Sequence, residues 1–221
     1  MPPIKVERVP ADLGNKDGSE RKALFITALL PVVLEVNQRV LADREQLLYL
    51  RDKMAGAGRH RRRSSASGSR TLADRYDTPV DRIDELVRRV DIVPPSMAIA
   101  QGGVESGWGT SLAARTGNAL FGQIQSADVA VPGAGMPQPF TNVGEATDAY
   151  IANLNTHPAY AGFRTERAAL RERGETLDGY QPDRHAAALF RARPATMCGS
   201  CARSCARTSS PISTRRALSS F

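Results

Sequence analysis

Helical periodicity is the feature that most constrains the fold of this chain. Over residues 19–54, apolar side chains recur near helical spacing, which is typical of an α-helix with a buried face; they include Leu24, Phe25, Leu29, Val33, Val36 and Val40. The apolar stretch at residues 24–36 is interrupted by Pro31 and Glu35. It is also shorter than the roughly 20 residues that span a bilayer. We therefore expect a buried helix here and not a membrane span.

The rest of the chain predicts further, shorter helices and little β-structure. Helices are expected over residues 72–76, 80–90, 95–105, 108–115, 145–155 and 162–173. The helix over residues 95–105 is apolar on nearly all sides, so we expect it to be the central buried helix. Residues 125–142 are rich in proline and glycine and predict a long irregular or β-hairpin segment. Since strand patterns are poor throughout, the predicted fold is mainly α.

One carboxylate, Glu105, ends the expected helix over residues 95–105. It stands in the run AIAQGGVESGWGTSLAARTGNALFGQ, where Ser106-Gly107-Trp108-Gly109 follow it. A glycosidase needs a carboxylic acid that holds a proton near neutrality, and an apolar approach favours that state. The glycines let a sugar come close to the backbone, and the indole offers a flat face to a pyranose ring. Glu105 is therefore the candidate general acid, the alternative being a structural carboxylate that caps a neighbouring element.

Three motifs occur together: ESGWG, GNALFGQ and NLNTHPAY. In this combination the chain resembles the glucosaminidase family of peptidoglycan hydrolases (mannosyl-glycoprotein endo-β-N-acetylglucosaminidase-like), and in particular its Bax-like members. The resemblance covers roughly residues 20–180 except the basic loop at 56–70. It implies a lysozyme-like, bilobed fold with a cleft. It also implies cleavage of the β-1,4 bond after N-acetylglucosamine in peptidoglycan, in the bacterial periplasm or cell envelope.

Most glycosidases need a second group beside the acid: a base, a nucleophile or the 2-acetamido group of the substrate. Asp128 is the only carboxylate between Glu105 and Glu145, so it is the candidate to activate water, unless it is simply solvated. Glu145 falls in the first turn of an expected helix, where a carboxylate complements the helix dipole. The resemblance also implies a tyrosine that assists at the anomeric centre, for which Tyr180 in DGYQP is the candidate.

The resemblance further implies a set of sugar-contacting residues. Trp108, Phe121 and Gln123 are candidates to contact the sugar, although Trp108, the only tryptophan, is equally suited to anchor the core. Tyr160 matches the HPAY motif and is expected at the wall of the cleft. Asn118 follows Gly117 and is expected to hydrogen-bond the backbone and hold the turn under Glu105. Neither a metal-ligand set nor a phosphate-cradling glycine loop is present in the sequence, so we expect no cofactor and no metal.

The net charge of +7 does not indicate nucleic-acid binding once it is located along the chain. Residues 185–221 hold no acidic residue and six arginines, so residues 1–184 carry only about +1; the arginines are Arg191, Arg193, Arg203, Arg207, Arg215 and Arg216. A second basic stretch, GAGRHRRRSSASGS, is expected to be a flexible loop at residues 56–70. It would be attracted to an anionic cell wall or membrane surface, or serve as a solvated linker.

Residues 185–221 form a tail that departs from the pattern of the family. It loses helical periodicity and contains all three cysteines, Cys198, Cys201 and Cys205, without a fourth cysteine or nearby histidine to complete a zinc site. We therefore hypothesise a frameshift near residues 185–195; a resequenced gene with an intact frame and the same cysteines would reject it. The expected organisation is a disordered lead at 1–18, a glucosaminidase-like domain at 19–184 and a disordered tail, in a monomer.

Two further interpretations remain open from the sequence. A lytic transglycosylase also places one glutamate before a serine on a lysozyme-like fold, but uses the muramyl 6-hydroxyl in place of water. A non-catalytic glycan-binding or scaffold protein is the other, because the tail replaces the segment in which family members carry a catalytic helper. The first residues contain no basic segment followed by an apolar stretch and a cleavage site. An exported enzyme would therefore start upstream or use another signal.

Overall fold

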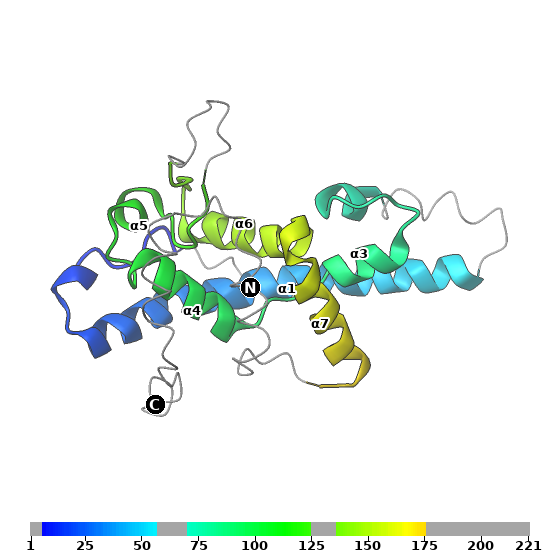
Figure 1. The fold of residues 1–221 in the computed structure, drawn as a ribbon, viewed down its shortest axis with the longest axis horizontal. Helices are drawn as coiled ribbons and strands as arrows, with labels where there is room; N and C mark the ends of the chain where they lie inside the picture. The colour runs from blue at the N-terminus through cyan, green and yellow to red at the C-terminus, as the bar shows by residue number, and fades with distance from the viewer. Residues whose placement is uncertain (1–5, 57–69, 125–135, 176–221) are drawn as a thin grey trace.

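The computed structural model describes residues 6–56, 70–124 and 136–175 (Figure 1). The basic loop, most of the irregular segment after Gln125, and the tail lie outside these residues. The described parts are helical, and their strand pairing is limited to an isolated antiparallel bridge between Ile124 and Pro137. The elements are η1 (Leu13–Asn15), α1 (Gly18–Gly56), a helix at residues 70–75, α3 (Ile83–Arg89), α4 (Pro95–Ser106), α5 (Leu112–Gly117), α6 (Val143–Thr156), η2 (Pro158–Tyr160) and α7 (Ala161–Glu172). The prediction of a mainly α fold is confirmed.

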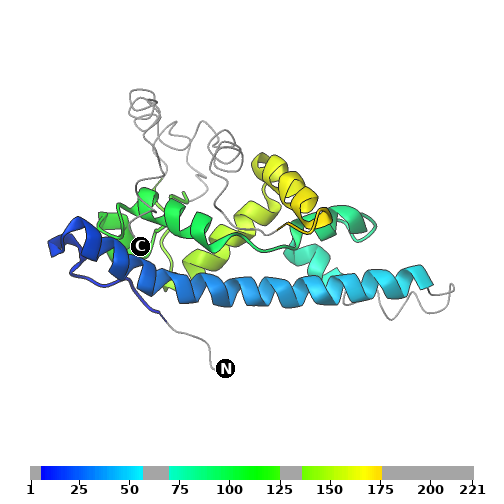
Figure 2. The ribbon, with the colours of Figure 1, turned by 90° about the horizontal axis from the view of Figure 1, so that it is seen from below.

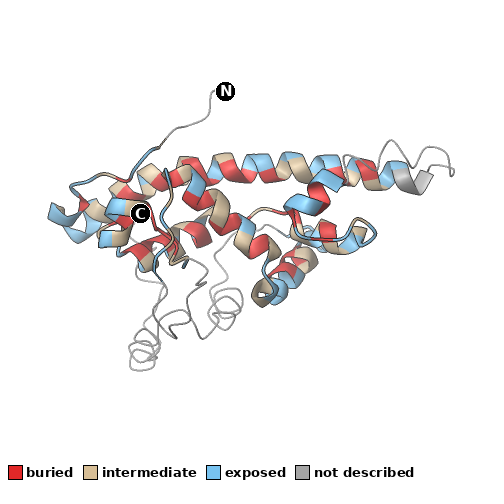
Figure 3. Cartoon of the chain, turned by 90° about the horizontal axis from the view of Figure 1, so that it is seen from above, coloured by how far each residue is buried: buried red, intermediate tan, exposed pale blue. Residues whose placement is uncertain are grey.

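Helix α1 is the longest of the described helices, and the other described helices lie along one side of it (Figure 2). Its buried residues face those helices, while its opposite side is exposed (Figure 3). Among the described helices, α1 is long and apolar enough to cross a membrane by length and composition, a test that core helices of globular proteins also pass. Since Phe25, Leu29 and Val33 are fully buried against protein, α1 serves here as the expected buried helix.

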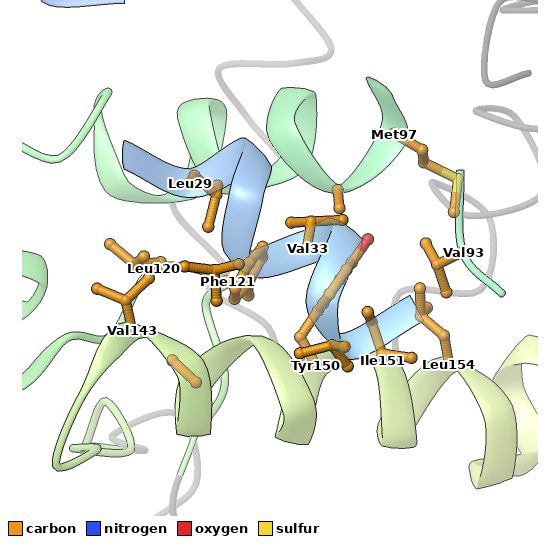
Figure 4. Close-up of a cluster of buried hydrophobic side chains, with 14 of the residues drawn as sticks. Leu29, Val33, Val93, Met97, Leu120, Phe121, Val143, Tyr150, Ile151 and Leu154 are labelled. Carbon is orange, nitrogen blue, oxygen red and sulfur yellow. The ribbon is translucent and has the colours of Figure 1, made fainter. Parts of the chain in front are cut away.

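Two hydrophobic clusters share α1. The larger cluster joins the N-terminal half of α1 to α4 and α6, where Leu29, Val33, Met97, Ile151 and Leu154 converge (Figure 4). The smaller cluster forms around the C-terminal half of α1 and consists of Leu47, Leu72, Ala73, Tyr76, Leu86 and Val90. Two cores along one helix are consistent with the bilobed arrangement that the family resemblance implies.

A buried ionic network fixes the linker between α3 and α4. Asp91 in this linker is 2% exposed, and its carboxylate accepts two hydrogen bonds from Arg171 of α7, at 3.0 Å from Nε and 2.7 Å from Nη2. Arg44 of α1 lies 3.5 Å from the same carboxylate. Arg167 is fully enclosed beside it and donates to the main-chain carbonyls of Arg88 and Ile92, both at distances below 3.0 Å. The network ties α1, α7 and the start of α4 together.

The N-terminal segment differs from the expected disordered lead. Residues 6–17 pack against the domain: Val9 is 5% exposed and Leu13 1% exposed within the larger cluster. The carbonyl of Val6 accepts a hydrogen bond of 3.2 Å from the backbone amide of Val143. The prolines and glycines suggested disorder, but the apolar side chains between them bury enough surface to order the segment.

Helix α4 is not the central helix that its apolar sequence predicts. It covers one flank of α1, and its outer side is exposed, with Val104 at 66%. Gly102 lets it approach closely, since a Cβ there would lie 3.1 Å from Phe121 and 3.2 Å from Leu29. The central position belongs to α1, because α4 uses small residues on its contact side and leaves part of its apolar surface in solvent.

Candidate active site

The motif after α4 forms a tight turn that ends the helix at Ser106. Gly107, Trp108 and Gly109 all have positive φ values, of 60°, 57° and 80°, which is uncommon for a residue other than glycine. The Ser106 hydroxyl braces this turn by donating to the carbonyl of Gly102 at 2.5 Å and accepting from the amide of Gly109 at 2.8 Å. A Cβ on Gly109 would lie 2.8 Å from Leu13. The turn therefore fixes Glu105 in the last turn of α4.

Glu105 is partly exposed and shares one side of α4 with Gln101, which stands one helical turn before it. Tyr150 of α6 reaches this side of α4 and donates its hydroxyl hydrogen bond to Oε1 of Gln101. Burial, followed by the neighbouring Tyr160 and Glu105, raises the pKa of Tyr150 well above its usual value. The Tyr150 phenol is therefore protonated at neutral pH. The structure thus brings Tyr150 of α6 to Gln101, on the side of α4 that carries Glu105, and Tyr160 of η2 packs against the hydrophobic cluster that contains Tyr150.

This cluster suits proton transfer. A carboxyl group can give up a proton, and the neutral amide of Gln101 one turn away can donate a hydrogen bond without adding charge. Within the described residues, no group of three or more histidine, cysteine, aspartate or glutamate side chains could hold a metal ion. A carboxyl group at this position is suited to the general-acid role that the sequence predicts for Glu105.

Trp108 lies away from this cluster. Its ring packs on Gly103, where a Cβ would meet three ring atoms at 3.0 Å, and contacts Phe25 edge to face at 5.7 Å between ring centroids. Gly103 and Glu105 are two residues apart, which places them about 200° apart around the helix. This placement favours the core-anchor role for Trp108 over sugar contact.

Phe121 is a core residue in this structure, so its predicted contact with sugar is corrected. It is 5% exposed and stacks face to face on Tyr150, with ring centroids 4.1 Å apart (Figure 4). Gly102 lies against its edge. Tyr150 and α4 cover the ring, which fits a role in the core better than contact with sugar.

Asn118 and Gln123 lie on either side of this buried segment. Asn118 has a φ of 51° and ends α5, and its amide nitrogen donates to the carbonyl of Phe140 at 3.0 Å. It therefore bonds the backbone as predicted, in the turn that follows α5. The carbonyl of Gln123 accepts from the amide of Gln138 at 2.8 Å, so Gln123 lies at the base of a hairpin-like pairing. In the described part of the chain, the Oδ1 of Asn118 and Oε1 of Gln123 are buried without a hydrogen-bond partner.

The remaining candidates have different outcomes. Asp128 and Tyr180 lie outside the described residues, so their roles stay predictions. Glu145 has the structural role that its position predicts: its carboxylate accepts from the amide of Thr141 at 2.7 Å, and its own amide donates to the Asn142 side chain at 2.8 Å. These contacts cap the start of α6.

Gln101 and Tyr150 are the members of the cluster that the sequence analysis missed. Gln101 could have been found from its position one turn before Glu105 on the same predicted helix. Tyr150 was harder to find from the sequence, because it fits the apolar pattern of its helix. The one indication is its hydroxyl, since a buried tyrosine hydroxyl usually has a hydrogen-bond partner.

Comparison with known proteins identifies the family of this chain. The glucosaminidase family, described as mannosyl-glycoprotein endo-beta-N-acetylglucosaminidase, matches residues 80–193. Protein bax of Escherichia coli (strain K12) is 36% identical over 165 residues, which is 70% of this chain and 58% of that protein. The chain thus spans less than two thirds of the length of this relative, and no solved structure matches it. The match covers about half of the chain and includes Glu105, so the predicted resemblance is confirmed and the chain belongs to the glucosaminidase family, a family of glycan-cleaving hydrolases.

Proposed function

We propose that this chain hydrolyses the β-1,4 bond after N-acetylglucosamine in peptidoglycan, with Glu105 as the general acid. The observation that carries the proposal is the position of Glu105 in the last turn of α4, beside Gln101 and Tyr150 and within the range that matches the family. The partner is the glycan strand, and the place of action is the periplasm or cell envelope.

In this mechanism Glu105 donates its proton to the glycosidic oxygen as the bond to the anomeric carbon breaks. Water then adds to the anomeric carbon, and its proton passes to a base. Asp128 remains the candidate for that base, with the 2-acetamido group of the substrate as the alternative nucleophile. Tyr150 stays neutral and takes no part in the proton transfer.

The test uses purified peptidoglycan with the wild-type chain, Glu105→Gln and Glu145→Gln. Products are reduced and the new ends identified by mass spectrometry. Loss of a general acid lowers the rate by about 10²–10⁴-fold, so we expect Glu105→Gln to release almost no product. Glu145→Gln is the matched control, because Glu145 caps α6 and its replacement keeps an acceptor oxygen for Thr141.

The products separate the alternatives. Reduced N-acetylglucosamine ends that disappear in Glu105→Gln and persist in Glu145→Gln would support the proposal. Anhydromuramyl ends would instead identify a lytic transglycosylase. Release of nothing by a folded wild-type chain that still binds glycan would identify a binding or scaffold protein.

A further inference from the structure

A buried polar contact joins α4 to α6 at Gln101, one helical turn before Glu105. The Tyr150 hydroxyl, on a side chain only 5% exposed, donates to Oε1 of Gln101. Because the Tyr150 side chain is buried, leaving its hydroxyl without a hydrogen-bond partner would cost free energy. Its position indicates a role other than core packing alone.

The Tyr150 ring has little freedom to move. It stacks on Phe121 with an angle of 10° between the ring planes, and Phe121 is in turn backed by Gly102 of α4, where a Cβ would lie 3.1 Å away. The stacking therefore restricts the position at which the Tyr150 hydroxyl meets α4. The hydroxyl is thus a fixed hydrogen-bond donor for the side chain that it contacts.

The contact also fixes which way the Gln101 amide faces. A glutamine amide has a carbonyl that accepts and an amino group that donates. Since the carbonyl oxygen points to the Tyr150 hydroxyl, the amino group points away from it. Gln101 and Glu105 are four residues apart on α4, so their side chains are neighbours on the helix surface.

We propose that Tyr150 and Gln101 are positioning residues for Glu105: the Tyr150 hydroxyl orients the Gln101 amide, whose amino group is presented to the Glu105 carboxyl group and holds its rotamer toward the substrate. This inference rests on the proposed role of Glu105 as the acid. A general acid must come within about 2.6–3.2 Å of the oxygen that it protonates, and a 1 Å misplacement can lower the rate by about 10²-fold.

Tyr150→Phe tests this, because it removes the hydroxyl and keeps the ring that stacks on Phe121. We expect kcat on peptidoglycan to fall by about tenfold while KM changes by less than about twofold, since orientation affects the transition state more than substrate binding. Gln101→Met should lower kcat similarly, and the double variant should fall no further than either single variant.

Tyr76→Phe is the matched control. Tyr76 is also buried, at 3% exposed, and its hydroxyl donates to Asp43 at 2.8 Å, but it belongs to the smaller cluster away from α4. It should lose comparable stability and keep wild-type kcat. A Tyr150→Phe variant with wild-type kcat, or one that matches Tyr76→Phe in both melting temperature and kcat, would overturn the inference and leave the proposed function intact.

A second readout does not depend on turnover. The ¹³C resonance of the Glu105 carboxyl carbon, assigned by its loss in Glu105→Gln, is recorded at one pH in each variant. We expect it to shift in Tyr150→Phe and in Gln101→Met but not in Tyr76→Phe. An inactive wild-type chain would reject the proposed function. The resonance would still test whether Tyr150 positions Glu105, because a chemical shift unchanged by Tyr150→Phe would refute that inference.

Discussion

Replacing Asp91 by asparagine should destabilise the domain more than any surface charge change. Asp91 is 2% exposed, and its carboxylate pairs with Arg44 and Arg171, while the enclosed Arg167 donates to its main-chain carbonyl and is stabilised by its charge. Burial lowers the pKa of Arg167 to about 9, so its guanidinium is still charged at neutral pH. Asp91→Asn would leave that cation buried without its counter-charge.

The magnitude follows from these contacts. Removing one partner of a buried ion pair costs about 3–5 kcal/mol, because the other charge stays desolvated. Asparagine keeps one oxygen that can accept from Arg171, and the carbonyls of Arg88 and Ile92 still solvate Arg167. We therefore expect a loss near the lower limit, about 3 kcal/mol, out of a total stability of about 5–15 kcal/mol for a typical domain.

Urea unfolding, followed by circular dichroism at neutral pH, measures this loss. Asp148→Asn is the control, because Asp148 pairs with Arg39 at 3.3 Å while 41% exposed, and an exposed pair contributes about 0–1 kcal/mol. Equal losses in the two variants, or a loss below about 1 kcal/mol in Asp91→Asn, would refute the reasoning.

Further predictions concern acid and glycine substitutions. Burial acts to raise the pKa of Asp91, but the hydrogen bond from Arg171 and the charges of Arg167 and Arg44 together lower it below its ordinary value of 3.8. The Asp91 carboxylate therefore stabilises the fold above pH 3.8, and this stabilisation is lost as the pH falls through its lowered pKa. In urea titrations, the difference in unfolding free energy between wild type and Asp91→Asn should therefore shrink on acidification. Gly103→Ala would place a Cβ 3.0 Å from the Trp108 ring, and we expect a loss of about 1–3 kcal/mol and altered tryptophan fluorescence. Gly162→Ala in α7, with no atom within 4 Å of its Cβ, should instead be neutral or stabilising by up to about 1 kcal/mol; similar losses in both variants would contradict the steric explanation.

The helices were predictable because their periodicity is a local property. The helix expected over residues 95–105 spans Pro95–Ser106, and the one expected over 145–155 spans Val143–Thr156. The helix expected to begin at Trp108 begins instead at Leu112. The left-handed backbone at Trp108 and Gly109 explains the difference, and sequence patterns carry little sign of positive φ at a tryptophan.

The candidate site was predictable in part. Its sequence motif singles out Glu105, and Tyr160 packs against the larger hydrophobic cluster, which also contains Tyr150. Two other features depend on packing between distant segments: the burial of Phe121 under Tyr150, and the hydrogen bond from Tyr150 to Gln101 across 49 residues. The same holds for Asp91 and Arg171, which meet across 80 residues. Each such residue fits its local pattern equally well with or without its partner.

The single helix that carries both hydrophobic clusters has a consequence for how this domain unfolds. Neither cluster can lose α1 without exposing its own apolar side chains, and α1 is one unbroken helix from Gly18 to Gly56. If α1 unfolds from one end, the unfolding first disrupts the cluster at that end and then, as it extends along the helix, the second cluster. The two halves of the molecule should consequently form a single cooperative unit. A protease cut between Val40 and Leu47 should therefore destabilise both clusters, even though it touches neither Glu105 nor the turn that holds it.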